Sequence, residues 1–197
     1  MMNNRYGSEV NMPLLAALII IIISFSSIWV TWLKIEAKAY GNSVDETLDF
    51  TDIMDADEEF TQYSDKLENS GMDSSELISK SEYDAMKNSF YTMKYAGLVG
   101  YILLGIAGVC LFISRKAMTA ASLLSAVAFI VSIIGALQYC SKTEKYMDDF
   151  SRKVLQGLIT IRYDLSIDKG IIIPLICAIA VTVIGFMAGR KQSYQGY

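Results

Sequence analysis

Four long stretches of the chain contain no charged residue and are almost entirely apolar. They run from Val10 to Leu33, from Tyr95 to Ser114, from Ala117 to Ser141 and from Gly170 to Gly189. A helix rises about 1.5 Å per residue, so about 20 apolar residues cross the hydrocarbon core of a bilayer. Strands of a barrel would be shorter and would alternate polar with apolar residues. The pattern predicts four transmembrane helices, over residues 13–33, 95–114, 117–138 and 170–189.

A second pattern, strict alternation of apolar and polar residues, precedes the fourth span. The apolar positions are Ile159, Ile161, Tyr163, Leu165 and Ile167. Such alternation predicts a half-buried strand over 159–167. A weaker alternation over 33–39 follows the first span, residues 40–43 have turn composition, and residues 47–53 are a candidate third strand. Because a lone strand is not stable, these segments are expected to pair in one antiparallel sheet that joins both long loops.

The rest of the two long loops has helical spacing. Residues 55–69 are rich in Asp and Glu and carry Phe60, Tyr63 and Leu67 on one face. The segment 81–84 resembles a capping box, after which a helix is expected to run into the second span. The third span is expected to project outward until Gly157. The predicted fold class is a membrane all-α four-helix transmembrane bundle with a small extracellular antiparallel β-sheet in an α+β outer domain.

The distribution of basic residues predicts the orientation of the chain. The short polar segments 1–12, 115–116 and 190–197 carry Arg5, Arg115, Lys116, Arg190 and Lys191, with Glu9 as their one acid. Basic residues are retained on the cytoplasmic side. Both termini are therefore expected in the cytoplasm of an integral cell-membrane protein, with the loops 34–94 and 139–169 outside. Lysines 34, 94, 142 and 169, at the outer ends of the spans, weaken this bias.

The first long loop is strongly acidic. Residues 34–94 hold 15 Asp and Glu against 6 Lys and Arg, a net charge of −9. Such a loop attracts neither nucleic acid nor an anionic membrane surface. Its densest cluster is a weak calcium candidate, formed by Asp55, Asp57, Glu58 and Glu59. Oxygen ligands suit Ca²⁺, but the EF-hand spacing is missing. A solvated helix start explains these acids better.

The residue inventory argues against catalysis and ion coupling. The chain has no histidine, and so lacks the commonest general base and metal ligand. No Asp, Glu, Lys or Arg lies within a span, although coupled transporters normally need such residues. Neither long loop contains two cysteines that could form a disulfide within it. We therefore expect no catalytic residue, no cofactor and no dedicated metal site.

Small residues line parts of two spans. They are Gly97, Gly100, Gly105 and Gly108 in the second span, and Ala121, Ser125, Ala128, Ser132 and Ala136 in the third. Small residues let helices approach closely in lipid. They are expected to make helix–helix contacts, within one four-helix bundle in the simpler interpretation and with another subunit in the alternative. Four aromatic residues near the outer ends of spans, Trp29, Trp32, Tyr95 and Tyr139, are expected at the headgroup level.

The whole arrangement resembles the claudin-like tetraspan superfamily, which includes claudins, peripheral myelin protein relatives and calcium-channel gamma subunits. The shared features are four spans, a large first outer loop, the short Arg115-Lys116 turn, a long third helix, and strands after the first span and before the fourth. Members of the family typically carry a Trp, a Gly-Leu-Trp and two disulfide-bonded cysteines in the first outer loop. Here that motif and the cysteine pair are missing: Trp29 and Trp32 lie at the outer end of the first span, and Tyr40-Gly41 is only a faint counterpart. The resemblance covers architecture across nearly the whole chain.

These observations favour a non-enzymatic tetraspan membrane protein. We expect it to act as a structural, adhesion or accessory subunit through its outer domain, in contact with membrane lipids and with other membrane-protein subunits or further copies of itself. The alternative is a subunit of an oligomeric channel or transporter complex. A membrane enzyme is the third possibility.

Overall fold

The computed structural model describes residues 12–39, 42–56, 80–154 and 161–193. Its elements are α1 (Met12–Ser26), the 3-10 turn η1 (Ser27–Trp29), β1 (Leu33–Ala39), β2 (Asn42–Leu48), a helical segment over 50–56, α3 (Lys80–Cys110), α4 (Arg115–Val154), β3 (Arg162–Ile167) and α5 (Lys169–Ser193). Helices α3, α4 and α5, and α1 together with η1, are long and apolar enough to cross a membrane. The presence of four such spans is confirmed in this sense, but their bounds differ from the prediction. The first helical stretch ends at Trp29, and Leu33 already belongs to β1. The turn between the second and third spans lies at 111–114, because residues 115 and 116 begin α4.

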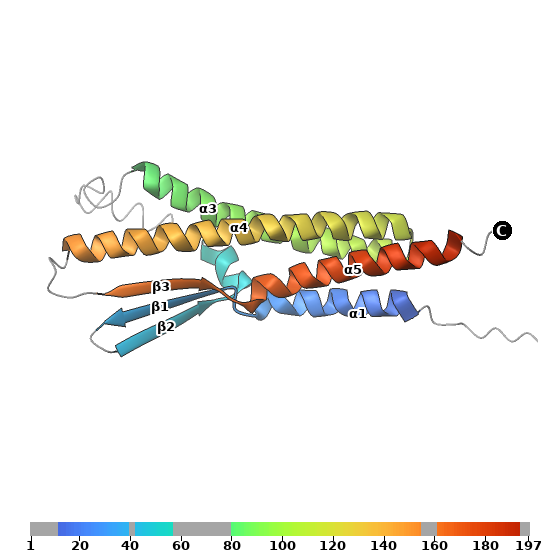
Figure 1. Ribbon diagram of the computed structural model, residues 1–197, viewed down its shortest axis with the longest axis horizontal. Coiled ribbons are helices and arrows are strands. Elements are labelled where there is room, and N and C mark those ends of the chain that lie inside the picture. The colour runs from blue at the N-terminus through green and yellow to red at the C-terminus, as the bar shows by residue number, and fades with distance from the viewer. Residues whose placement is uncertain (1–11, 40–41, 57–79, 155–160, 194–197) are drawn as a thin grey trace, which may run out of the picture.

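Two parts of the molecule share the long helices α3 and α4 (Figure 1). We call α1, α5, residues 95–110 and residues 115–138 the bundle. The three strands, residues 50–56, residues 80–94 and residues 139–154 form the sheet domain. Helix α4 has 40 residues and is about 60 Å long, so it extends well beyond a hydrocarbon core of about 30 Å. Its predicted stop at Gly157 lies outside the described residues.

The three strands form one antiparallel sheet in the order β2-β1-β3. In the register, Leu33 of β1 lies opposite Leu48 of β2 and Ile167 of β3. Segments 120 or more residues apart in the sequence therefore meet in one sheet, as the two alternating patterns predicted. Of the predicted strand 159–167, residues 162–167 are β3, residue 161 precedes it, and 159–160 lie outside the described residues.

Three sequence predictions around the sheet are wrong in detail. The second strand is Asn42–Leu48 rather than 47–53, because residues 50–56 are helical. Asn42 and Ser43, predicted in a turn, pair with β1 instead. Helix α3 already includes Lys80, so Ser81 is helical and is not its N-cap. Phe60, Tyr63 and Leu67 lie outside the described residues.

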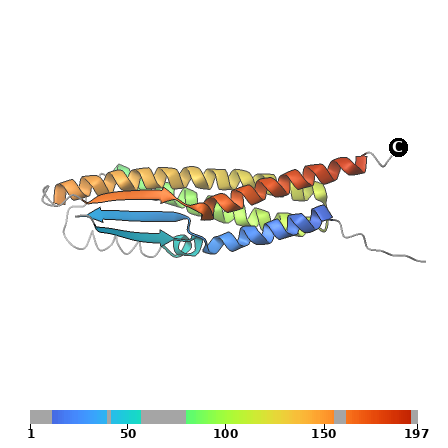
Figure 2. The same cartoon turned by 60° about the horizontal axis from the view of Figure 1, so that its bottom comes forward.

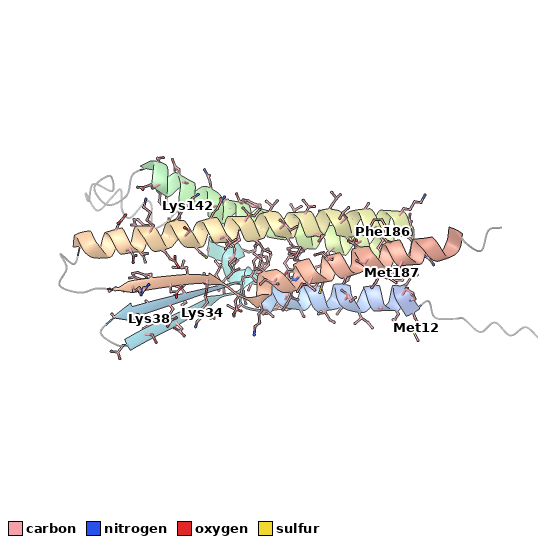
Figure 3. All side chains as sticks on the ribbon, viewed as in Figure 1. Met12, Lys34, Lys38, Lys142, Phe186 and Met187 are labelled. Atoms are coloured by element: carbon pink, nitrogen blue, oxygen red, sulfur yellow. The ribbon has the colours of Figure 1, made fainter. Side chains whose placement is uncertain are left out.

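The bundle presents large apolar side chains on its outer surface (Figure 3). They include Leu15, Ile19, Ile22, Ile23, Val99, Ile102, Ile106, Val109, Leu123, Leu124, Val127, Ile130, Ile172, Ile176, Ile179, Val183, Phe186 and Met187. A soluble protein rarely exposes so continuous an apolar surface, whereas hydrocarbon solvates it well. Every helix of the bundle contributes to this surface.

The small residues of α3 and α4 face other parts of the same chain. A side chain at Gly97 would meet Trp32, one at Gly100 would meet Phe129, and those at Gly105 and Gly108 would meet α1. On α4, the hydroxyls of Ser125 and Ser132 donate hydrogen bonds to the carbonyl oxygens of Gly100 and Met93, at 2.8 and 2.7 Å. Ala121 and Ala136 are buried, while Ala128 is half-buried. The contacts of Gly100, Ser125 and Ser132 bring α3 and α4 close together, and those of the other three glycines pack α3 against Trp32 and α1.

Candidate interaction surface

The sheet domain is joined to the bundle at Trp32. The Trp32 N–H donates to the carbonyl oxygen of Leu48 at 2.8 Å, and the Trp32 carbonyl accepts from the N–H of Asp168 at 2.9 Å. The N–H of Gly170 donates to the carbonyl oxygen of Thr31 at 2.8 Å. Because these bonds join the ends of all three strands and the start of α5, they fix this end of the sheet to the bundle.

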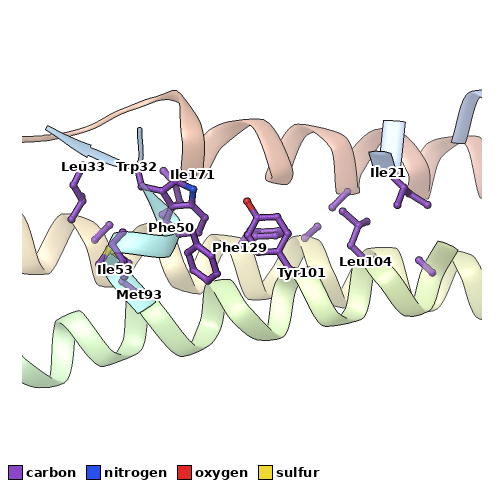
Figure 4. Packing of buried hydrophobic residues seen from close by; sticks show 14 of the residues in the cluster. Ile21, Trp32, Leu33, Phe50, Ile53, Met93, Tyr101, Leu104, Phe129 and Ile171 are labelled. Atoms are coloured by element: carbon purple, nitrogen blue, oxygen red, sulfur yellow. The ribbon is translucent and has the colours of Figure 1, made fainter. Parts of the chain in front are cut away.

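The Trp32 side chain fills the space beneath the sheet (Figure 4). It is completely buried, and its ring lies 4.6 Å from the ring of Phe50, centroid to centroid. Phe50 in turn contacts Tyr101, and Tyr101 contacts Phe129, at 5.2 and 5.1 Å. The Tyr101 hydroxyl is hydrogen-bonded to the Ser27 hydroxyl at 2.8 Å, so this buried polar group has its partner. The aromatic cluster connects the sheet, residue 50, α3 and α4.

The four aromatic residues predicted at the headgroup level separate into two groups. Trp29 and Tyr95 are exposed at the outer surface, 71% and 51% of their area respectively. Trp32 and Tyr139 are buried inside the protein, so their rings contact other side chains and cannot contact lipid headgroups. An aromatic residue near the end of a span can serve either environment, and the sequence alone does not distinguish them.

Two lysines near this junction are held by the protein. Lys94 is 2% exposed, and its Nζ donates to the carbonyl oxygen of Met54 at 2.7 Å. The Nζ of Lys142 donates to the Ala85 carbonyl at 2.9 Å and to the Ser89 hydroxyl at 2.7 Å. Lys94 thus ties the 50–56 segment to α3, and Lys142 ties α4 to α3. Both have structural contacts that explain why they occur at this level.

One edge of the sheet is closed by α4. The Glu144 carboxylate accepts a hydrogen bond from the backbone N–H of Leu165, with 2.7 Å between Oε1 and N. Leu165 is buried, so this N–H has a charged acceptor in place of water. Strand β3 is therefore an edge strand whose outer side is covered.

We expect Glu144→Ala to lower the free energy of unfolding by about 1–3 kcal/mol, because it leaves a buried N–H without an acceptor. Glu144→Gln keeps an oxygen acceptor and should cost less than about 1 kcal/mol. Amide hydrogen exchange measures the effect directly. The Leu165 amide should lose protection in the alanine variant and keep most of it in the glutamine variant. Equal protection in both variants would show that the side chain of residue 144 does not hold this edge.

The helical segment 50–56 begins with a capping box. The Asp49 carboxylate accepts hydrogen bonds from the N–H groups of Thr51 and Asp52, at 2.8 and 3.0 Å. In return, the Asp49 N–H donates to the Asp52 carboxylate at 2.9 Å. This reciprocal arrangement is the reason that residues 50–56 form a helix and do not continue the strand.

Acidification should weaken this cap. Burial raises the pKa of Asp49, but the hydrogen bonds from Thr51 and Asp52 outweigh it and hold the pKa below its usual value of 3.8. The stabilisation is therefore complete above the unfolded-state pKa and is lost as the pH falls through the lower folded-state pKa. We expect Asp49→Ala to cost about 1 kcal/mol at pH 7. Asp49→Asn keeps a side-chain oxygen that accepts the hydrogen bonds, but this amide does not titrate. The stability of that variant should therefore fall less than the stability of the wild type between pH 5 and pH 2. Thermal unfolding in detergent at these values measures both differences, and parallel pH curves for the wild type and Asp49→Asn would contradict the assignment.

The polar face of the sheet carries a row of acids between basic residues. Asp164, Glu36 and Asp45 lie opposite one another across the three strands. Lys34 pairs with Asp45 at 3.2 Å and Lys38 with Glu36 at 2.9 Å. The Asp45 carboxylate raises the pKa of Lys34 through a hydrogen bond and through its charge. These pairs offset the repulsion of neighbouring carboxylates, which would otherwise destabilise the sheet.

The calcium candidate is only partly within the described residues. Asp55 lies in the 50–56 helical segment, while Asp57, Glu58 and Glu59 lie outside the described ranges. Across residues 12–39, 42–56, 80–154 and 161–193, no three Cys, His, Asp or Glu side chains are grouped so that they could hold a metal ion.

Comparisons with known protein families, with curated proteins and with solved structures find no match to this chain.

Proposed function

We propose that this chain is a non-enzymatic, integral tetraspan protein of the cell membrane. It acts as a structural, adhesion or accessory subunit whose sheet domain lies outside the cell and contacts another protein. The observation that carries the proposal is a folded polar sheet, held firmly on one end of an apolar four-helix bundle. The architectural resemblance to claudin-like proteins is part of this proposal.

The orientation of the bundle rests on charge. Helix α4 begins at Arg115, and its start lies at the end of the bundle away from the sheet (Figure 1). The Arg115 Nη1 donates to the carbonyl oxygen of Ala188 in the last turns of α5. Three of the four lysines that weaken the sequence bias, Lys34, Lys94 and Lys142, each have a protein acceptor within the sheet domain. The fourth, Lys169, is exposed at the start of α5. Arg115 and Lys116, the first residues of α4, together with the basic residues 190 and 191 of α5, outnumber Lys169. They therefore support a cytoplasmic position for that end.

Cysteine labelling on intact cells tests the orientation. In a background with the three native cysteines replaced by alanine, Ser43→Cys on exposed β2 should react with a membrane-impermeant maleimide. Ser114→Cys, exposed between α3 and α4, is the matched control and should react only after the cells are lysed. The reverse pattern would place the sheet domain in the cytoplasm.

The contact function is supported by what the sheet domain offers. Residues 42–47 of β2 and the polar side chains of β3 are exposed, and Lys34 and Glu36 between them are half-buried. The domain is nevertheless fixed by Trp32, Lys94 and Lys142. A fixed, solvated surface is suited to recognition because binding does not have to pay for ordering it. A bundle that served only to fill lipid would not need such a domain.

Affinity purification from native membranes in mild detergent tests the function. We expect a stoichiometric protein partner to remain with the tagged full chain, as measured by the mass of the intact complex. The purified chain alone, reconstituted in liposomes, should conduct no ions. Selective ion flux without a recovered partner would instead support a subunit of an oligomeric channel or transporter.

A further inference from the structure

The two edges of the sheet differ. Helix α4 lies along β3, and Glu144 takes the outward N–H of Leu165. The strand order β2-β1-β3 makes β2 the opposite edge, and Figure 2 shows it on the side of the sheet away from α4. All seven residues of β2 pair with β1 in unbroken register. Among the described residues, no element pairs with the other side of β2.

The register identifies the backbone groups at this open edge. Successive residues of a strand direct their N–H and C=O groups to opposite sides. The backbone N–H of Leu165 points toward α4. The backbone groups of its neighbour Asp164 therefore point toward β1 and bond to those of Glu36, which lies opposite. The backbone groups of Ile35, the next residue of β1, then point toward β2. Ile35 lies opposite Glu46, so the backbone groups of Glu46, and of every second residue of β2 counted from it, bond to β1. The N–H and C=O groups of Ser43, Asp45 and Thr47 therefore point away from the sheet, in the arrangement that a further strand would require.

The side chains along this edge carry one sign of charge. Asp45 and Glu46 are adjacent and exposed on opposite faces of β2, and the apolar Val44 beside them is 70% exposed. Asp45 already pairs with Lys34 of β1 at 3.2 Å, so Glu46 contributes most of the charge that a partner would meet. The edge strand contains neither lysine nor proline, two devices that commonly protect edges. A second copy of β2 would bring acids against acids, and like charges on adjacent strands are destabilising. The charges favour a basic partner strand over self-pairing.

We propose that β2 is a docking edge to which an extended, basic segment of a partner protein adds as a fourth strand. The partner's basic side chains face Asp45 and Glu46, and an apolar side chain on the Glu46 face covers Val44. Main-chain hydrogen bonds supply affinity and the alternate side chains supply selectivity. This inference rests on the proposed contact function and names the surface that performs it.

Three synthetic peptides separate strand addition from simple charge attraction. The basic probe, Val-Thr-Arg-Lys-Val-Thr-Val, matches β2 in antiparallel register. The second probe has Glu in place of Arg and Lys. The third is the basic probe with alternate backbone nitrogens methylated, which keeps its charge but removes the donors on one edge. Each is labelled with fluorescein, and binding to the full chain is measured by anisotropy in phosphatidylcholine nanodiscs, whose zwitterionic surface does not attract the peptide.

We expect the basic probe to bind and to protect the amides of Ser43, Asp45 and Thr47 from hydrogen exchange. The acidic and the methylated probes should bind at least tenfold more weakly. Glu46→Lys should weaken the binding affinity for the basic probe at least tenfold. The control Asp164→Lys makes the same charge change on β3 and should change that affinity less than twofold. Absence of binding up to about 1 mM, or equal binding of the methylated probe, would overturn strand addition at β2.

The same variants separate this inference from the proposed function. If the native partner is recovered with the wild type and is retained undiminished by Glu46→Lys, the contact function holds and the β2 edge is not its surface. If no partner is recovered with the wild type, the contact function itself fails, whichever peptides bind.

Discussion

Trp32→Ala should lower the free energy of unfolding by about 3–5 kcal/mol, the range for removing a buried aromatic side chain. The ring is completely buried and contacts Phe50 beneath the sheet. Its loss leaves a cavity at the point where the sheet joins the bundle. Denaturant unfolding in mixed micelles, followed by circular dichroism, measures the change, and the expected result is a lower midpoint with an unchanged slope.

Trp29→Ala is the matched control, because the two tryptophans are three residues apart in the sequence. Trp29 is 71% exposed at the surface of the bundle, so its replacement should cost less than about 1 kcal/mol. Similar costs for the two replacements would mean that Trp32 does not join the sheet domain to the bundle.

Gly170→Ala should cost about 3 kcal/mol or more and should greatly reduce the yield of folded protein. A Cβ atom at this position would overlap the carbonyl oxygen of Val30 and Cδ1 of Trp32, and would lie 2.6 Å from the carbonyl oxygen of Thr31. Two of these three atoms are backbone carbonyl oxygens, and moving the Thr31 carbonyl away would strain the hydrogen bond that it accepts from Gly170.

Gly108→Ala on α3 is the control for Gly170→Ala. A Cβ atom there would meet only Ile21, at an ordinary contact distance of 3.7 Å, and alanine favours the helix by about 1 kcal/mol over glycine. We expect this variant to be as stable as the wild type or more so. Size-exclusion chromatography and thermal unfolding in detergent compare the two variants, and equal stability would show that the close approach at Gly170 does not constrain the fold.

The sequence predicted those parts of the fold in which one force dominates. The four spans follow from long charge-free stretches, since charged groups are costly in hydrocarbon. Strands β1 and β3 follow from alternation, because one face is buried against the protein and the other is wet. Strand β2 lacks this signal, as all its residues except Leu48 are exposed, and only its pairing with β1 identifies it.

The prediction of a strand over 47–53 failed for a different reason. Leu48 and Phe50 imitate alternation, but the mutual hydrogen bonds of Asp49 and Asp52 start a helix between them. The Asp-x-x-Asp spacing was visible in the sequence as a variant of the capping box. The candidate surface on β2 was less predictable, because it depends on which strand lies at the uncovered edge of the sheet. That is set by the strand order β2-β1-β3 and by Glu144, about 100 residues away in the sequence, which covers the β3 edge.

The continuity of α4 has a mechanical consequence. One unbroken helix runs from Arg115, beside the end of α5, to the sheet domain, where Glu144 holds β3. Helix α3 runs beside it, joined by Ser125, Ser132 and Lys142. There is consequently no hinge between the two parts along these helices, and the sheet cannot tilt without bending both. Under the proposed contact function, a partner that binds the sheet would therefore also constrain the tilt of the whole bundle relative to the bilayer.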